Sequence, residues 1–67
     1  MSNMPWRVGD VVMLMNVGES WGKFALITRI WITECGTGQI YMLANGLMST
    51  IPFASHEKHI AGVVSDR

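Results

Sequence analysis

The sequence lacks the disulfide-forming cysteine pairs that usually stabilise a small domain and the long apolar segments that attach a protein to a membrane. Its 67 residues include one cysteine, Cys35, so no disulfide can form within the chain. A lone cysteine is typical of a reducing compartment, which predicts a cytoplasmic protein. No segment reaches the ~18 uninterrupted apolar residues of a membrane-spanning helix. The first residues also lack the basic and apolar pattern of a secretory signal, so we expect no membrane partner.

Charged residues are sparse and balanced, with five Lys and Arg against five Asp and Glu. A protein that follows the phosphates of DNA or RNA usually has a basic surplus, because each neutralised phosphate releases counterions. The zero net charge therefore disfavours nucleic acid as a general partner, while a local basic spot stays open. The acidic residues are scattered over separate segments, so the sequence lacks the paired carboxylates of a hydrolase.

Candidates for metal binding or catalysis are few. His56 and His59 are three residues apart and could face one metal ion on a helical turn, but a stable zinc site needs three or four ligands. Cys35 with a histidine could form a nucleophile and its base, yet no oxyanion donors are evident around it. Gly36 and Gly38 precede a predicted strand rather than a helix, which argues against a phosphate-binding loop. We predict no metal, no cofactor and no enzymatic activity.

What the sequence does contain is a series of short apolar segments divided by turn residues. The predicted strands are 11–15, 24–33, 39–43, 47–53 and 61–64. Asn45-Gly46 predicts a two-residue type I′ hairpin turn, since both residues tolerate positive φ. Ser55 is expected to cap a short 3-10 turn over 55–59, just before the last strand. Pro52 has no N–H and should lie at a strand edge or strand end.

This order predicts an all-β fold, a single SH3-like barrel of about five strands that spans residues 8–64. An N-terminal arm, 1–7, precedes the barrel and a polar tail, 65–67, follows it. The second strand is long enough to bend and serve two sides of the barrel. A chain of this size buries only ~60% of its unfolded surface, so its own core contributes few kcal/mol.

Hydrophobic residues make up 49% of the chain, and they occupy both faces of the predicted strands. Val11 and Met13 share one parity, Val12 and Leu14 share the other, and residues 40–43 repeat the pattern. One parity can fill the barrel, whereas the other needs a partner. A second copy of the chain is the simplest candidate, so we predict a homo-oligomer.

Several short patterns follow one another along the chain: Gly9-Asp10-x-Val12, Trp21-Gly22-x-Phe24, Tyr41-x-Leu43, and His59-Ile60 ahead of a final valine strand. Together they resemble the SH3-like barrel superfamily. Its members include reductase accessory subunits, KOW-type transcription and ribosome modules, and many short phage or plasmid proteins. The resemblance implies a small accessory protein of phage or plasmid type.

Within that superfamily, the Gly-Asp turn and Pro52-Phe53-Ala54 are similar to features of the plasmid-borne type II dihydrofolate reductases. In that family a Val-Gln-Ile-Tyr stretch directly before the proline builds the active pore of a tetramer. Here the corresponding residues are Met48-Ser49-Thr50-Ile51. The glutamine and the tyrosine are missing, so the resemblance extends to the architecture and no catalytic residue is transferred.

One group of side chains could form a ligand site or a subunit interface: Trp21, Lys23, Arg29 and Trp31. They share one parity, so a regular strand would project them to one face, where indoles and cations could contact bases, phosphates or a peptide. Equally, the tryptophans could pack in an interface while the cations remain solvated. A bend in the strand would break the shared parity.

Three functions follow from these observations. The leading one is a non-enzymatic, self-associating module that binds another protein, as yet unknown. The alternative is a KOW-like nucleic-acid-binding module that uses the Trp21, Lys23, Arg29 and Trp31 group. The third is an oligomeric reductase similar to the type II enzymes, for which NADPH binding would be the test.

Overall fold

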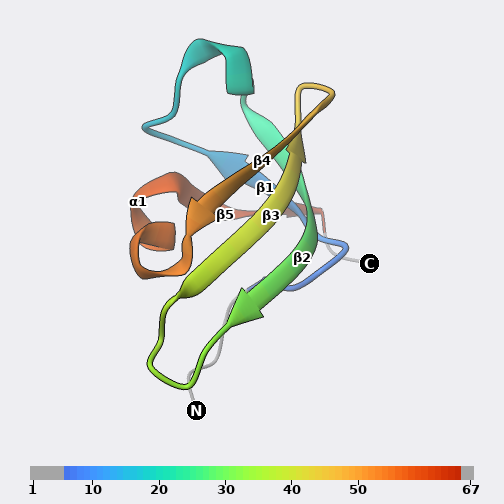
Figure 1. Ribbon diagram of the computed structural model, residues 1–67. Coiled ribbons are helices and arrows are strands. Elements are labelled where there is room, and N and C mark those ends of the chain that lie inside the picture. The colour runs from blue at the N-terminus through green and yellow to red at the C-terminus, as the bar shows by residue number, and fades with distance from the viewer. Residues whose placement is uncertain (1–5, 66–67) are drawn as a thin grey trace.

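The computed structural model describes residues 6–65 and contains one antiparallel sheet of five strands in the order β4-β3-β2-β1-β5 (Figure 1). The strands are β1 (Val11–Leu14), β2 (Phe24–Ile32), β3 (Gly38–Ala44), β4 (Leu47–Pro52) and β5 (Ile60–Ser65). Two 3-10 turns, η1 (Glu19–Trp21) and η2 (Phe53–Ser55), and one short helix, α1 (His56–His59), complete the described elements. The all-β prediction, with a short helical segment before the last strand, is confirmed.

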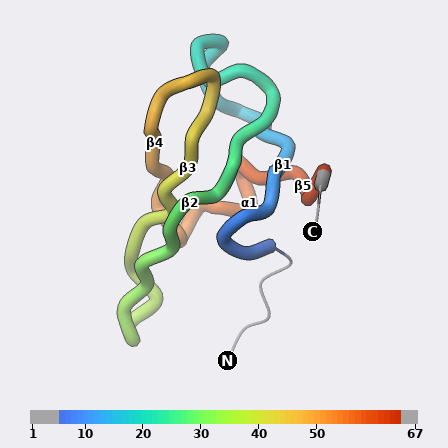
Figure 2. The backbone as a smooth tube through the Cα atoms, turned by 90° about the vertical axis from the view of Figure 1, so that its right-hand side faces the viewer, coloured from blue at the N-terminus to red at the C-terminus, as the bar shows by residue number. Residues whose placement is uncertain are grey.

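The sheet curls but does not close, because β4 and β5 remain its two edges (Figure 2). η2 and α1 connect these edge strands. Of the predicted terminal segments, residues 1–5 of the arm and 66–67 of the tail lie outside the described residues. Ser65 belongs to β5.

The core lies on the concave side of the sheet, where alternate residues of each strand meet. Its buried members are Trp6, Val12, Leu14, Ala25, Ile27, Ile40, Met42, Ala44, Ile51 and Ile60. Trp6 comes before the first strand and anchors the start of the described chain among these side chains. The parity that contains Val12 and Leu14 is thus the buried one, and Met13, on the opposite face of the strand, is exposed.

The Gly9-Asp10 turn joins this entry segment to β1 and is held by backbone groups. Asp10 is buried, and its Oδ2 accepts a hydrogen bond from the Arg7 N–H at 3.0 Å. The Asp10 N–H in turn donates to the Arg7 carbonyl at 3.0 Å. A buried carboxylate is costly without hydrogen bonds, so this pairing explains how an acidic side chain is tolerated beside the core.

The hairpin between β3 and β4 has the predicted two-residue turn. Ala44 and Leu47 are directly paired, and Asn45 and Gly46 both have positive φ, 53° and 81°. These are the dihedrals that a type I′ turn requires, so the prediction from Asn45-Gly46 is confirmed. Pro52 is the last residue of the edge strand β4, which also agrees with its predicted place.

A bulge at Thr28 interrupts the long strand β2. Ile27 pairs with Met42 and Arg29 pairs with Tyr41, so two steps along β2 match one step along β3. The Thr28 hydroxyl donates to the Tyr41 carbonyl at 3.2 Å. Such a bulge shifts the alternation by one residue and bends the strand. Even-numbered side chains are exposed before it and odd-numbered ones after it.

The prediction that Ser55 caps the following turn is wrong. Its side chain makes no cap hydrogen bond, and its hydroxyl donates instead to the Pro52 carbonyl at 3.4 Å. The reason is that Ser55 is itself the last residue of η2. Its side chain therefore serves the turn that precedes it rather than the helix that follows.

Candidate interaction surface

The convex side of the sheet carries a continuous apolar surface, which we call the outer face. It consists of the exposed side chains of Met13, Phe24, Leu26, Leu43 and Met48. Their continuity follows from the strand register, because Val11 pairs with Leu26, Leu26 with Leu43, and Leu43 with Met48. Directly paired residues lie on the same face of a sheet. One apolar row therefore crosses four strands.

Two groups of side chains lie on either side of this row, and the second, Arg29 and Trp31, extends the outer face beyond the five side chains named above. Met13 pairs with Phe24 at one end. Beyond the Thr28 bulge, the Arg29 guanidinium lies 5.4 Å from the centre of the Tyr41 ring, which is within cation–π range. Trp31 follows, 51% exposed and paired with Gln39. The bulge is what brings Arg29 and Trp31 to the same side as Phe24 and Leu26.

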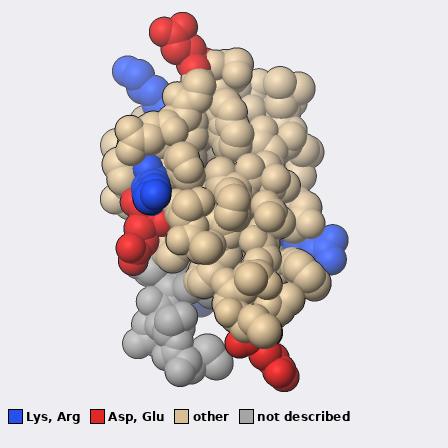
Figure 3. Space-filling view, turned by 60° about the vertical axis from the view of Figure 1, so that its left-hand side comes forward, with Lys and Arg blue, Asp and Glu red and all other residues tan. Residues whose placement is uncertain are grey.

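Charge is scarce on the neighbouring side of the molecule, which carries β4 and α1. There the Lys, Arg, Asp and Glu side chains lie around the margins of a broad uncharged area (Figure 3). The strand β4 itself, with the sequence Leu-Met-Ser-Thr-Ile-Pro, contains no charged residue. The apolar row thus ends at an edge of the sheet that has no charge to keep other strands away.

The predicted group of two tryptophans and two cations is divided by the structure. Trp21 lies in η1, half-buried against the core, and Lys23 is exposed just before β2. Arg29 and Trp31 lie past the bulge on the outer face. The physical reason is the extra residue at Thr28, which reverses the parity that an unbroken strand would have kept. Only Arg29 and Trp31 are brought together on one surface.

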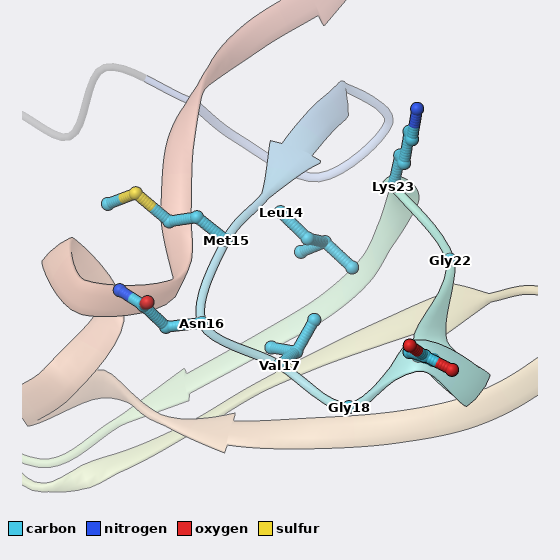
Figure 4. Close-up of a pocket in the computed structure, with 8 residues that line it drawn as sticks. Leu14, Met15, Asn16, Val17, Gly18, Gly22 and Lys23 are labelled. Carbon is cyan, nitrogen blue, oxygen red and sulfur yellow. The ribbon is translucent and has the colours of Figure 1, made fainter.

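Lys23 instead lines a hollow of about 390 Å³ under the loop between β1 and η1 (Figure 4). Leu14, Val17 and the acidic Glu19 also line it. The loop is tied to the helical segment, since the Asn16 side-chain amide donates to the Lys58 carbonyl at 3.0 Å and the Met15 N–H donates to the His59 carbonyl at 2.9 Å. No pattern in the sequence indicated this hollow.

The two histidines have different surroundings. His56 stacks on Phe53 at 4.8 Å between ring centres and meets Trp6 edge-on at 5.3 Å, with its Nδ1 2.8 Å from the Phe53 carbonyl. The Nδ1 of His59 is buried without a hydrogen-bond partner. Over residues 6–65, no three His, Cys, Asp or Glu side chains are grouped to hold a metal ion. Cys35 is exposed in the β2–β3 connection.

Comparison with known proteins adds no relative: no protein-family model, no curated protein and no solved structure matches this chain. Within the described residues, none of the helices has the length and apolar character needed to cross a membrane.

Proposed function

We propose that this protein is a non-enzymatic, self-associating interaction module whose outer face is its contact surface. The observation that carries the proposal is the apolar row that crosses four strands. The five exposed side chains of this face, together with Trp31, present on the order of 500 Å² of apolar surface, towards the upper end of the largest patches on soluble monomers. Patches of that size on small domains commonly mark protein contacts.

A second copy of the chain is the partner that the composition favours. A symmetric contact uses the same patch on both subunits, so an apolar face of one copy is matched by that of the other. The zero net charge means that two copies do not repel each other. Burial of the outer face would also add to the stability of a domain whose own core is small.

For the fold we propose membership of the SH3-like superfamily. Its support is the succession of five antiparallel strands with η2 and α1 placed between β4 and β5. Neither of the other two functions gains an observation of its own. The nucleic-acid alternative depended on four side chains acting together, and the outer face holds two of them. For the reductase alternative, the residues that replace the pore sequence, Met48 to Ile51, lie within the edge strand β4.

Analytical sedimentation at micromolar concentration tests the proposal. The wild-type chain should have the mass of at least two subunits. Leu43→Lys places a charge in the middle of the apolar row and should weaken association roughly tenfold or more. Ala54→Lys, at an exposed position in η2, is the matched control and should change nothing. A folded wild-type monomer, or equal association of both variants, would overturn the proposal.

A further inference from the structure

The edge strand β4 has a form that natural proteins usually avoid. All six of its residues pair with β3 without a register shift, so the strand is regular from Leu47 to Pro52. It carries no charged side chain. Exposed edges are normally protected by lysine, by proline or by a bulge, because unpaired N–H and C=O groups attract other strands. Here only the last residue, Pro52, has that protective character.

The hairpin turn determines which backbone groups of β4 are free. In a two-residue type I′ hairpin the residues that flank the turn, Ala44 and Leu47, form a hydrogen-bonded pair. Hydrogen-bonded and non-hydrogen-bonded pairs then alternate along the ladder. Ser49 therefore directs its N–H and C=O towards β3, while Met48 and Thr50 direct theirs away from it. Pro52 falls in the outward series, where its missing N–H costs the fold nothing.

The two most exposed large hydrophobic side chains of the described residues are neighbours on this strand. Leu47 is 64% exposed and Met48 is 62% exposed. They lie on opposite faces of the sheet, because Leu47 pairs with the buried Ala44 and Met48 pairs with Leu43 of the outer face. A partner that lay flat on the outer face would cover Met48 alone. A strand added at the edge would cover both.

We propose that β4 pairs antiparallel with β4 of a second copy, about a two-fold axis at Ser49. In this register Met48 of each copy faces Thr50 of the other, so all four outward N–H groups of these residues find carbonyl acceptors. Leu47 of each copy lies opposite Ile51 of the other, on the core side. The two sheets join into one of ten strands, and the outer faces become continuous.

This inference rests on the self-association proposed above and specifies one of its contacts. A short strand edge with two large side chains buries less than the ~800 Å² per partner of a stable interface. The outer face would supply the remainder by packing against another such pair. A second copy is favoured because β4 has no charged side chain, so like charges do not meet across the two-fold axis, and because the exposed Met48 of each copy then lies opposite the exposed Thr50 of the other.

Cysteine cross-linking tests the register. In a Cys35→Ser background, Ser49→Cys places two thiols directly opposite each other across the axis, at a Cα separation suited to a disulfide. Leu47→Cys is the matched control: it is more exposed than Ser49, but its two copies would lie four residues apart along the pair of strands. Mild oxidation should link Ser49→Cys into dimers roughly tenfold faster than Leu47→Cys.

The outcomes separate this inference from the proposed function. Faster linking of Ser49→Cys, in a protein that sediments as an oligomer, supports the β4 pairing. An oligomer in which Leu47→Cys links as fast or faster overturns the pairing and leaves self-association standing. A Cys35→Ser protein that sediments as a folded monomer overturns both.

Discussion

The two edges of the sheet differ in regularity. β5 pairs with β1 through two register shifts, so its ladder is irregular, and it includes Gly62. β4 pairs with β3 residue by residue, without any shift. Both strands have six residues and neither carries a charge. The difference therefore lies in the regularity of the pairing rather than in length or charge.

This contrast indicates that one edge is protected and the other is available. A bulged edge twists away from the flat geometry that another strand needs, so β5 is a poor template for strand addition. A regular edge with outward N–H groups is a good one. Since the same chain provides both edges, variants at matched positions of β4 and β5 can test whether the contrast has a consequence.

Among the variants that concern the two edges, the largest effect should come from Gly38→Ala, at the start of β3, the strand that pairs with β4. Gly38 has φ of 148°, and an added β-carbon would collide with the Trp31 carbonyl oxygen and lie 2.8 Å from the Ile32 Cα. We expect a loss of about 3 kcal/mol in unfolding free energy, measured by chemical denaturation. Gly62→Ala in β5 is the control, because its φ is ordinary and no atom lies within 4 Å. An equal loss in both variants would contradict this expectation.

A somewhat smaller loss of unfolding free energy is expected when the Asn45-Gly46 turn, which leads into β4, is strained. Gly46 has φ of 81°, so Gly46→Val forces a β-branched residue into a disfavoured region at a cost of about 1–2 kcal/mol or more. Gly46→Asn should lose less, because asparagine tolerates positive φ. The midpoint of urea unfolding reports both. If Gly46→Val unfolds at the wild-type midpoint, the turn is not as described.

Adding a charged side chain to the edge strand β4 should weaken self-association without lowering the unfolding free energy. Thr50→Lys adds an exposed lysine at a residue whose backbone N–H and C=O point away from β3. It should raise the dissociation constant of the oligomer roughly tenfold. Ala61→Lys adds the same charge at an exposed position of β5 and should leave sedimentation unchanged. Equal effects at the two edges would remove the distinction between them.

The smallest effect is expected away from both edges, at Trp31. This side chain is 51% exposed, so Trp31→Ala should lower the unfolding free energy by less than ~1 kcal/mol. Trp6→Ala, at a core position, should cost about 3–5 kcal/mol. Thermal denaturation of the two variants measures the difference.

A binding experiment tests the nucleic-acid alternative. Salt-dependent binding of single-stranded DNA that is abolished by Trp31→Ala or by Arg29→Ala would favour that alternative over the proposed function.

The sequence predicted the strands and turns well where local chemistry determines them. Asn45-Gly46 specifies its own hairpin, and the alternation in β1 places Val12 and Leu14 on one face and Met13 on the other, of which the structure buries the first. Those signals lie within a few residues of one another. Each is also strong, since few residue pairs accept a type I′ turn.

The candidate site was harder to predict, because it depends on pairing between strands. The Thr28 bulge is a mismatch between β2 and β3, and no single segment shows it. Parity counted along β2 alone therefore grouped Lys23 with Arg29, although the two lie on opposite sides of the bulge. The apolarity of both strand faces was visible in the sequence, but the row from Leu26 to Met48 emerges only from the register.

The pairing of β1 with β5 has a consequence for the order of folding. Val12 meets Val63 only when the two ends of the described chain come together, whereas β3 and β4 are joined by two residues. Contacts distant in sequence form slowly, so the β3–β4 hairpin should be in place before the sheet is complete. Incompletely folded chains would then expose the β4 edge, whose outward N–H and C=O groups can pair with another strand. Refolding yield should fall with rising protein concentration, and Thr50→Lys should restore it.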